Sequence, residues 1–101
     1  MNKKIGVYVN GCFHITFENG VTVSATIGCG TYSGNRNNNG GYSYLATHPD
    51  IQSDTVEIAI WDKNDDYITS KWSQDNGNDV SGWQSPENLL DALNWAKQYQ
   101  A

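Results

Sequence analysis

The chain has 101 residues, and eleven acidic side chains against six basic ones give it a net charge of −5. A chain of this length holds one hydrophobic core, so we expect a single domain spanning residues 1–101. No stretch approaches the roughly 20 consecutive apolar residues of a membrane span. Lys and Arg do not cluster as nucleic-acid binding requires, so neither a membrane nor direct nucleic-acid contact is expected.

The first half of the chain predicts a three-stranded antiparallel meander. Residues 5–27 alternate apolar and polar side chains, and Asn-Gly pairs at 10–11 and 19–20 interrupt the alternation. Asn-Gly between alternating runs is the strongest short-range hairpin signal. The expected apolar face carries Phe13, Ile15, Phe17, Val21, Val23, Ala25 and Ile27. The expected polar face carries Cys12, His14, Thr16, Thr22, Ser24 and Thr26.

Residues 28–44 form a run rich in Gly, Asn and Tyr, and we expect a long loop there. The glycine spacing does not fit a dinucleotide fingerprint, and no helix follows to offer N–H groups to a phosphate. Connections this long tend to be functional or disordered, so a binding loop and a plain flexible loop are both open. If the loop binds, the cation and the amphipathic contact residues are Arg36, Tyr32, Tyr42 and Tyr44.

The second half predicts more strands and then a helix. Residues 54–62 alternate like a fourth strand, 67–72 like a fifth, and 80–83 like a short extended segment. A helix is expected after Ser85, because Ser at the N-cap, Pro86 and Glu87 mark a helix start. Its apolar stripe consists of Leu89, Ala92, Leu93, Ala96 and Tyr99, with Leu90 and Trp95 on its shoulders. The fold class is therefore α+β, with an antiparallel sheet of four to five strands packed against one C-terminal α-helix.

Four tryptophans and six tyrosines compensate for few aliphatic residues. Large aromatic side chains bury much apolar area, so we expect an aromatic-rich core. The tryptophans are Trp61, Trp72, Trp83 and Trp95, and they are assigned mainly to that core.

Charge is unevenly distributed, since residues 50–101 carry ten of the eleven acids. An acidic surface can complement a basic protein groove or simply keep a small protein soluble. The acidic candidates for binding a partner are Asp62, Asp65, Asp66, Asp75 and Asp79. Asp62, Asn64 and Asp66 alternate as in a calcium loop, but Tyr67 stands where such a loop needs glycine, so a solvated turn is expected.

Two cysteines, Cys12 and Cys29, give few options for chemistry. Cys12 and His14 would share one face of a strand, which is the geometry of a thiol beside a base. Unpaired cysteines are mostly structural, so inert thiols are expected and no catalytic residue is assigned. The cysteines and histidines lack the paired spacing of a zinc site, and no metal or other cofactor is expected.

Three segments, 17–32, 56–62 and 82–90, together resemble small accessory proteins of bacteriophages and prophages. Many small acidic phage proteins resemble anti-CRISPR or other anti-defence factors, which act by occupying a surface of a host machine. The resemblance implies non-catalytic binding to a host bacterial protein, with a nucleic-acid-binding defence complex as one such partner. It transfers no functional residue.

The leading expectation is therefore a cytoplasmic inhibitor of a bacterial defence system that acts through protein–protein contact. Two alternatives stay open: a small-ligand or nucleotide-signal binding protein that uses residues 28–44, and a thiol enzyme that uses Cys12 and His14. Nothing in MNKK and the residues after it has a signal peptide's apolar run, which favours the cytoplasm. An exposed sheet edge or the polar face also makes a homodimer an expectation.

Overall fold

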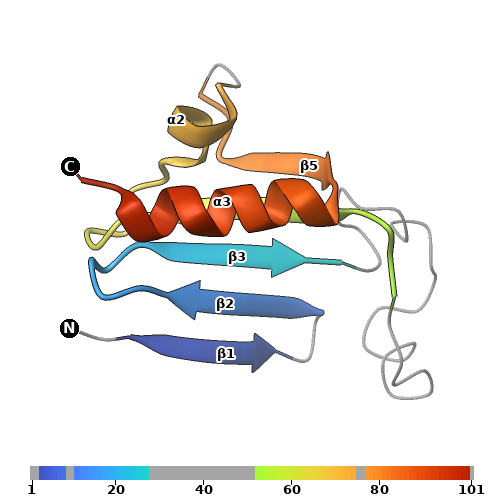
Figure 1. The fold of residues 1–101 in the computed structure, drawn as a ribbon, viewed down its shortest axis with the longest axis horizontal. Coiled ribbons are helices and arrows are strands. Elements are labelled where there is room, and N and C mark those ends of the chain that lie inside the picture. Colours follow the sequence, from blue (N-terminus) through green and yellow to red (C-terminus); the bar gives the residue numbers. More distant parts are fainter. Residues whose placement is uncertain (1–2, 9–10, 28–51, 75–76, 101) are drawn as a thin grey trace.

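A computed structural model describes residues 3–8, 11–27, 52–74 and 77–100. Its elements are β1 (Lys4–Tyr8), β2 (Cys12–Thr16), β3 (Thr22–Thr26), β4 (Val56–Trp61), α2 (Thr69–Ser73), β5 (Val80–Gln84) and α3 (Pro86–Gln98). The five strands form one antiparallel sheet in the order β1-β2-β3-β4-β5, and α3 lies across one of its faces (Figure 1). The predicted α+β class is confirmed.

Glycine closes both turns of the meander, as the Asn-Gly pairs predicted. Gly11 and Gly20 each have φ of +83°, a conformation that side chains with a Cβ rarely adopt. The Gly20 N–H donates to the Phe17 carbonyl at 2.9 Å. A Cβ at Gly20 would lie 2.6 Å from Lys63 Cβ, so the β2–β3 turn packs closely against the turn that follows β4.

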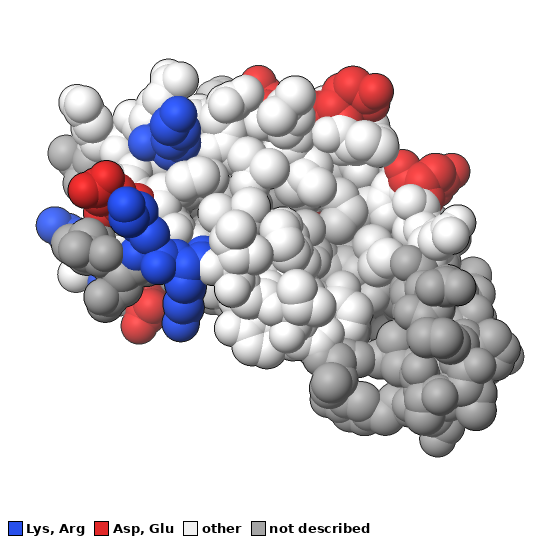
Figure 2. Space-filling view, turned by 60° about the horizontal axis from the view of Figure 1, so that its bottom comes forward, with Lys and Arg blue, Asp and Glu red and all other residues white. Residues whose placement is uncertain are grey.

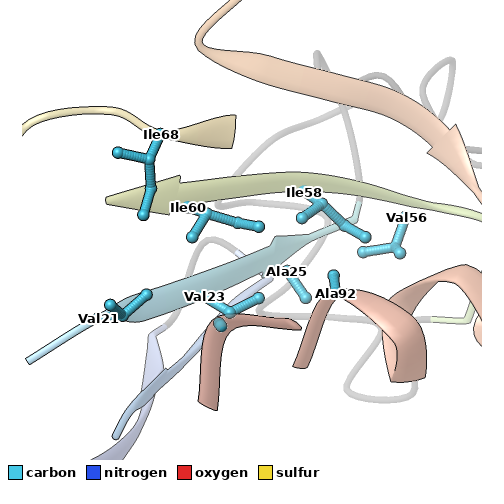
Figure 3. Packing of buried hydrophobic residues seen from close by; sticks show 9 residues of the cluster. Val21, Val23, Ala25, Val56, Ile58, Ile60, Ile68 and Ala92 are labelled. Carbon is cyan, nitrogen blue, oxygen red and sulfur yellow. The ribbon is translucent and has the colours of Figure 1, made fainter. Parts of the chain in front are cut away.

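The core lies between α3 and the sheet face that the alternation predicted (Figure 3). Its buried members are Val21, Val23, Ala25, Val56, Ile58, Ile60, Ile68, Ala92 and Ala96. The predicted helix stripe is confirmed, because Leu89, Leu93 and Tyr99 also pack against this cluster. Leu90 is exposed, so the stripe is narrower on that side than expected.

The predicted strand at 67–72 is wrong. Tyr67 makes one isolated bridge to Trp61, and the chain then turns into the short helix α2 at Thr69. The Thr69 hydroxyl accepts a hydrogen bond from the Ile60 N–H of β4 at 2.8 Å. In a regular strand pair, a backbone carbonyl would accept this bond. The fifth strand is β5, in the segment predicted as a short extended piece.

The tryptophans are only partly core residues, so their common assignment is corrected. Trp72 and Trp95 pack against the core cluster, as expected. Trp83 is exposed, and Trp61 lies on the opposite sheet face, because it occupies the outward phase of β4.

Both ends of α3 are capped by side chains. Ser85 Oγ accepts from the Asn88 backbone N–H at 3.1 Å, as the sequence predicted. At the other end, Asn19 in the β2–β3 turn donates from Nδ2 to the carbonyls of Ala96 at 2.9 Å and Tyr99 at 3.1 Å. Among the described residues no helix combines the length and hydropathy needed to cross a bilayer.

Candidate binding face on the sheet

The candidate site is the sheet face opposite α3, which we call the polar face. The strand register places its members in rows across the sheet. They are Lys4, Gly6, Tyr8, Cys12, His14, Thr16, Thr22, Ser24, Thr26, Glu57, Ala59 and Trp61. The six members predicted from β2 and β3 are confirmed, and the structure adds those from β1 and β4.

Four rings follow one another across the polar face. The ring centroids of Tyr8 and His14 are 4.7 Å apart, those of His14 and Trp61 5.1 Å, and those of Trp61 and Tyr67 5.9 Å. We call these four residues the aromatic row. The tilted and edge-to-face geometries are those that aromatic pairs favour. Tyr8 is 44% exposed and Tyr67 52%, so both ends of the row are open to contact.

Small residues make the aromatic row possible. Gly6, Ser24 and Ala59 share the cross-strand row of His14. The Tyr8 side chain folds back over Gly6, where a Cβ would lie 2.9 Å from the Tyr8 hydroxyl oxygen. Space left by these small side chains lets rings from β1 and β4 reach His14 on β2.

Hydroxyl groups beside the rings bond to one another. Thr16 Oγ1 and Thr22 Oγ1 are 2.8 Å apart, and Cys12 Sγ lies 3.2 Å from Ser24 Oγ. Thr26 Oγ1 donates to the same sulfur at 3.3 Å. Cys12 and Ser24 are buried, and these bonds satisfy their polar atoms. The face is therefore preorganised by its own hydrogen bonds.

Cys12 and His14 share the polar face, as predicted, but they have different neighbours. The thiol is free, buried and bonded to two hydroxyls. The His14 ring lies between the rings of Tyr8 and Trp61, tilted to the first and edge-to-face with the second. Burial lowers the pKa of His14, and the nearby Lys4 charge lowers it further, so the imidazole is neutral at pH 7.

A hollow of about 250 Å³ opens beside the aromatic row. Its walls combine rings, hydroxyls and charges of both signs. The lining residues are Lys4, Tyr8, His14, Thr16, Gly20, Thr22, Trp61, Asp62, Lys63 and Asp65. Two lysines and two aspartates balance, so the hollow has no net charge of its own.

The acidic candidates divide into two places. Asp62, Asp65 and Asp66 share the turn after β4, where Asp62 Oδ1 accepts from the backbone N–H of Asn64 at 2.9 Å and of Asp66 at 3.0 Å. Asp79 is exposed directly before β5. The turn is thus hydrogen-bonded through its own carboxylate. Within the described ranges, no group of three or more Cys, His, Asp or Glu side chains can hold a metal ion.

The other candidates lie outside the described residues. They are Tyr32, Arg36, Tyr42 and Tyr44 of the 28–44 segment, together with Cys29 and Asp75.

The described lysines gather at one end of the molecule, whereas acidic side chains lie at both ends. The described lysines lie at the end where the chain termini and the C-terminus of α3 are found, and Figure 2 shows them gathered on one side of that view. Asp62 and Asp65 line a hollow with Lys4 and Lys63, and Glu18 lines a groove with Lys3, Lys4 and Lys97. Glu87 lies in the first turn of α3, at the other end of that helix from Lys97. Lys97 in the last turn of α3 complements the helix dipole.

Sequence reasoning missed the aromatic row, although a signal was present. Tyr8, His14 and Trp61 all fall in the outward phase of their strands. An aromatic residue in the polar phase of an alternating strand points away from the core, and three in one sheet predict a shared surface. Comparisons with protein-family models, with curated proteins and with solved structures gave no match. The residues of the polar face therefore carry the functional argument.

Proposed function

We propose that the protein acts by non-catalytic binding and that the aromatic row contacts a protein partner. The observation that carries this proposal is the run of four rings with two exposed tyrosines at its ends. Tyrosine and tryptophan are enriched among the residues that dominate binding energy at protein interfaces. Because the rings are held by a rigid sheet, little conformational entropy is lost when they are covered.

The rim of the hollow supports a partner of mixed charge. Lys4 and Lys63 stand beside Asp62 and Asp65, so a partner can pair with both signs at close range. Charged rims contribute to orientation and association rate more than to affinity. The exposed Asp65 and Asp66 extend the acidic side of this rim. We propose that they contact a basic groove on the partner.

The partner class follows from the resemblance to phage accessory proteins. It is a component of a bacterial defence system, and the protein acts as its inhibitor in the host cytoplasm. An inhibitor of this kind needs a preorganised binding surface and no catalytic activity. The internally bonded hydroxyls and the neutral His14 support a surface of that kind.

Affinity capture from a bacterial lysate, followed by mass spectrometry, tests the proposal. Tyr67→Ala and Tyr8→Ala should each reduce recovery of the partner at least tenfold. Leu90→Ala is the matched control, since Leu90 is an exposed apolar residue on α3 at the opposite face. Equal recovery of the same partner by all three variants would contradict the proposal. Asp65→Lys with Asp66→Lys tests the acidic rim in the same assay.

A second candidate function is binding of a small planar ligand in the hollow. Three of its lining rings, Tyr8, His14 and Trp61, can stack on a flat group, and Lys4 can pair with an anion. At about 250 Å³ the hollow is slightly smaller than typical ligand pockets, which span about 300–1,000 Å³, so it suits a small ligand. Thermal-shift measurements with a panel of cyclic nucleotides test this alternative. A ligand that stabilises the wild type and not Lys4→Met would support it.

A further inference from the structure

We infer that two copies of this chain pair through β1, antiparallel, about a two-fold axis at Gly6. The starting observation is the sheet order, in which β1 is a terminal strand and pairs only with β2 among the described strands. Ile5 is 70% and Val7 79% exposed. The middle of β1, Ile5, Gly6 and Val7, carries no charge, although Lys4 stands at its start. Natural proteins avoid leaving an apolar stretch of edge strand exposed unless another strand covers it.

The backbone of β1 offers its free groups at the right positions. The Tyr8 carbonyl accepts from Gly11 N–H at 3.2 Å, which places it on the β2 side of the strand. Peptide groups in a strand alternate in direction, so the N–H and C=O of Ile5 and Val7 point to the open edge. These two residues can therefore exchange backbone hydrogen bonds with a second strand.

The sequence of β1 is self-complementary about Gly6. An antiparallel pair centred there sets Ile5 against the partner's Val7, and Lys4 against the partner's Tyr8. The apolar side chains meet on the α3 side of the sheet, and each lysine meets an aromatic ring on the polar face. The two Lys4 residues are four positions apart along the strand, about 13 Å, which exceeds the Debye length of about 8 Å.

The apolar side of β1 has no cover from α3. The helix packs mainly on β3 and β4, and Ile5, Ile15 and Phe17 line a groove of about 510 Å³. The same groove is also lined by the charged residues Lys3, Lys4, Glu18 and Lys97, the last from α3. In the paired arrangement the partner's Val7 lies beside Ile5 at the border of this groove. Pairing thus removes apolar surface from water on both copies, which is the driving force for association.

The pairing would also join the two polar faces. Each aromatic row ends at Tyr8 on β1, so the rows of the two copies would meet at the shared edge with Lys4 of the partner subunit beside Tyr8. The result is one continuous sheet of ten strands, twice the five of each copy.

Sedimentation equilibrium of the full chain tests the inference. The wild type should form a dimer that dissociates on dilution, since a short edge contact lies at the weak end of interfaces. Ile5→Lys and Val7→Glu should each raise the dissociation constant at least tenfold. Leu90→Lys, which puts the same charge on an exposed apolar position of α3, should leave it unchanged.

Mixing variants tests the register. Ile5→Lys chains mixed with Val7→Glu chains should form heterodimers, because the register sets the new lysine against the new glutamate. Ile5→Lys mixed with Ile5→Glu should not, because position 5 does not face itself. A wild type that stays monomeric at about 1 mM would overturn the inference. Equal association of Ile5→Lys and wild type would also overturn it, and so would failure of the first mixture to associate.

Discussion

At the scale of single residues, Thr69 shows how one hydroxyl holds a junction together. The side chain is fully buried, accepts from Ile60 N–H at 2.8 Å and donates to the Asp79 carbonyl at 2.7 Å. Thr69→Val keeps the shape and leaves both backbone groups unpaired, so we expect a loss of about 2–4 kcal/mol in the free energy of unfolding. Urea denaturation measures it. Thr69→Ser keeps the hydroxyl and should lose less than half as much.

His14 gives a prediction for pH. Its pKa lies below 6.5, first because of burial and then because of Lys4. The unfolded chain takes up this proton near pH 6.5 and the folded chain only at lower pH, so stability falls as pH drops through that window. Lys4→Met removes the second cause and should raise the pKa of His14, as an NMR titration of its ring protons can measure. Lys97→Met removes an equal charge elsewhere and should leave the pKa unchanged.

At the scale of elements, the sequence predicted what local chemistry determines. The Asn-Gly turns, the phase of β2 and β3 and the Ser85 cap all depend on residues close in the chain, and all are confirmed. The strand prediction for residues 67–72 failed because a run of six alternating residues does not determine which strand it pairs with. The Ile68 N–H donates to the Ile60 carbonyl at 2.8 Å, as it would in a strand pair. The next hydrogen bond, from the Ile60 N–H, goes to the Thr69 side chain and not to a backbone carbonyl.

Asn19 connects the β2–β3 turn to the C-terminus of α3, which is far away in the chain. No sequence pattern predicted this contact. Its amide donates to carbonyls at the C-terminus of α3, and its Oδ1 accepts from Val21 N–H at 3.0 Å. Asn19→Ala should cost about 1–2 kcal/mol and speed amide exchange in the last turn of α3. Asn19→Asp should cost more, because a carboxylate cannot donate and lies at the negative end of the helix dipole.

The control for Asn19 is Asn78→Asp, the same chemical change at an exposed position before β5. It should alter the free energy of unfolding by no more than about 0.5 kcal/mol. If Asn19→Asp were as stable as Asn78→Asp in urea denaturation, the proposed tie between the β2–β3 turn and α3 would be wrong.

At the scale of the whole molecule, the candidate site depends on a register that the sequence does not determine. Trp61 meets His14 because β4 pairs with β3 so that Trp61 is opposite Thr22. The chain between these strands spans residues 27–55, and a long connection leaves register to tertiary packing. The face of each residue was therefore predictable from alternation, but the row of rings that crosses several strands was not.

The two-layer arrangement gives the last prediction. Ala92 and Ala96 of α3 are fully buried against the sheet, and such small residues let the helix approach β3 and β4 closely. Ala92→Leu inserts a larger side chain into the buried cluster, where Figure 3 shows Ala92 beside Ala25 and Val56. We therefore expect a loss of about 1–3 kcal/mol in the free energy of unfolding. Asn94→Leu places the same side chain at an exposed position of the helix and should change stability by no more than about 0.5 kcal/mol. Equal midpoints for both variants in thermal unfolding would mean that the helix does not rest on the sheet through its alanines.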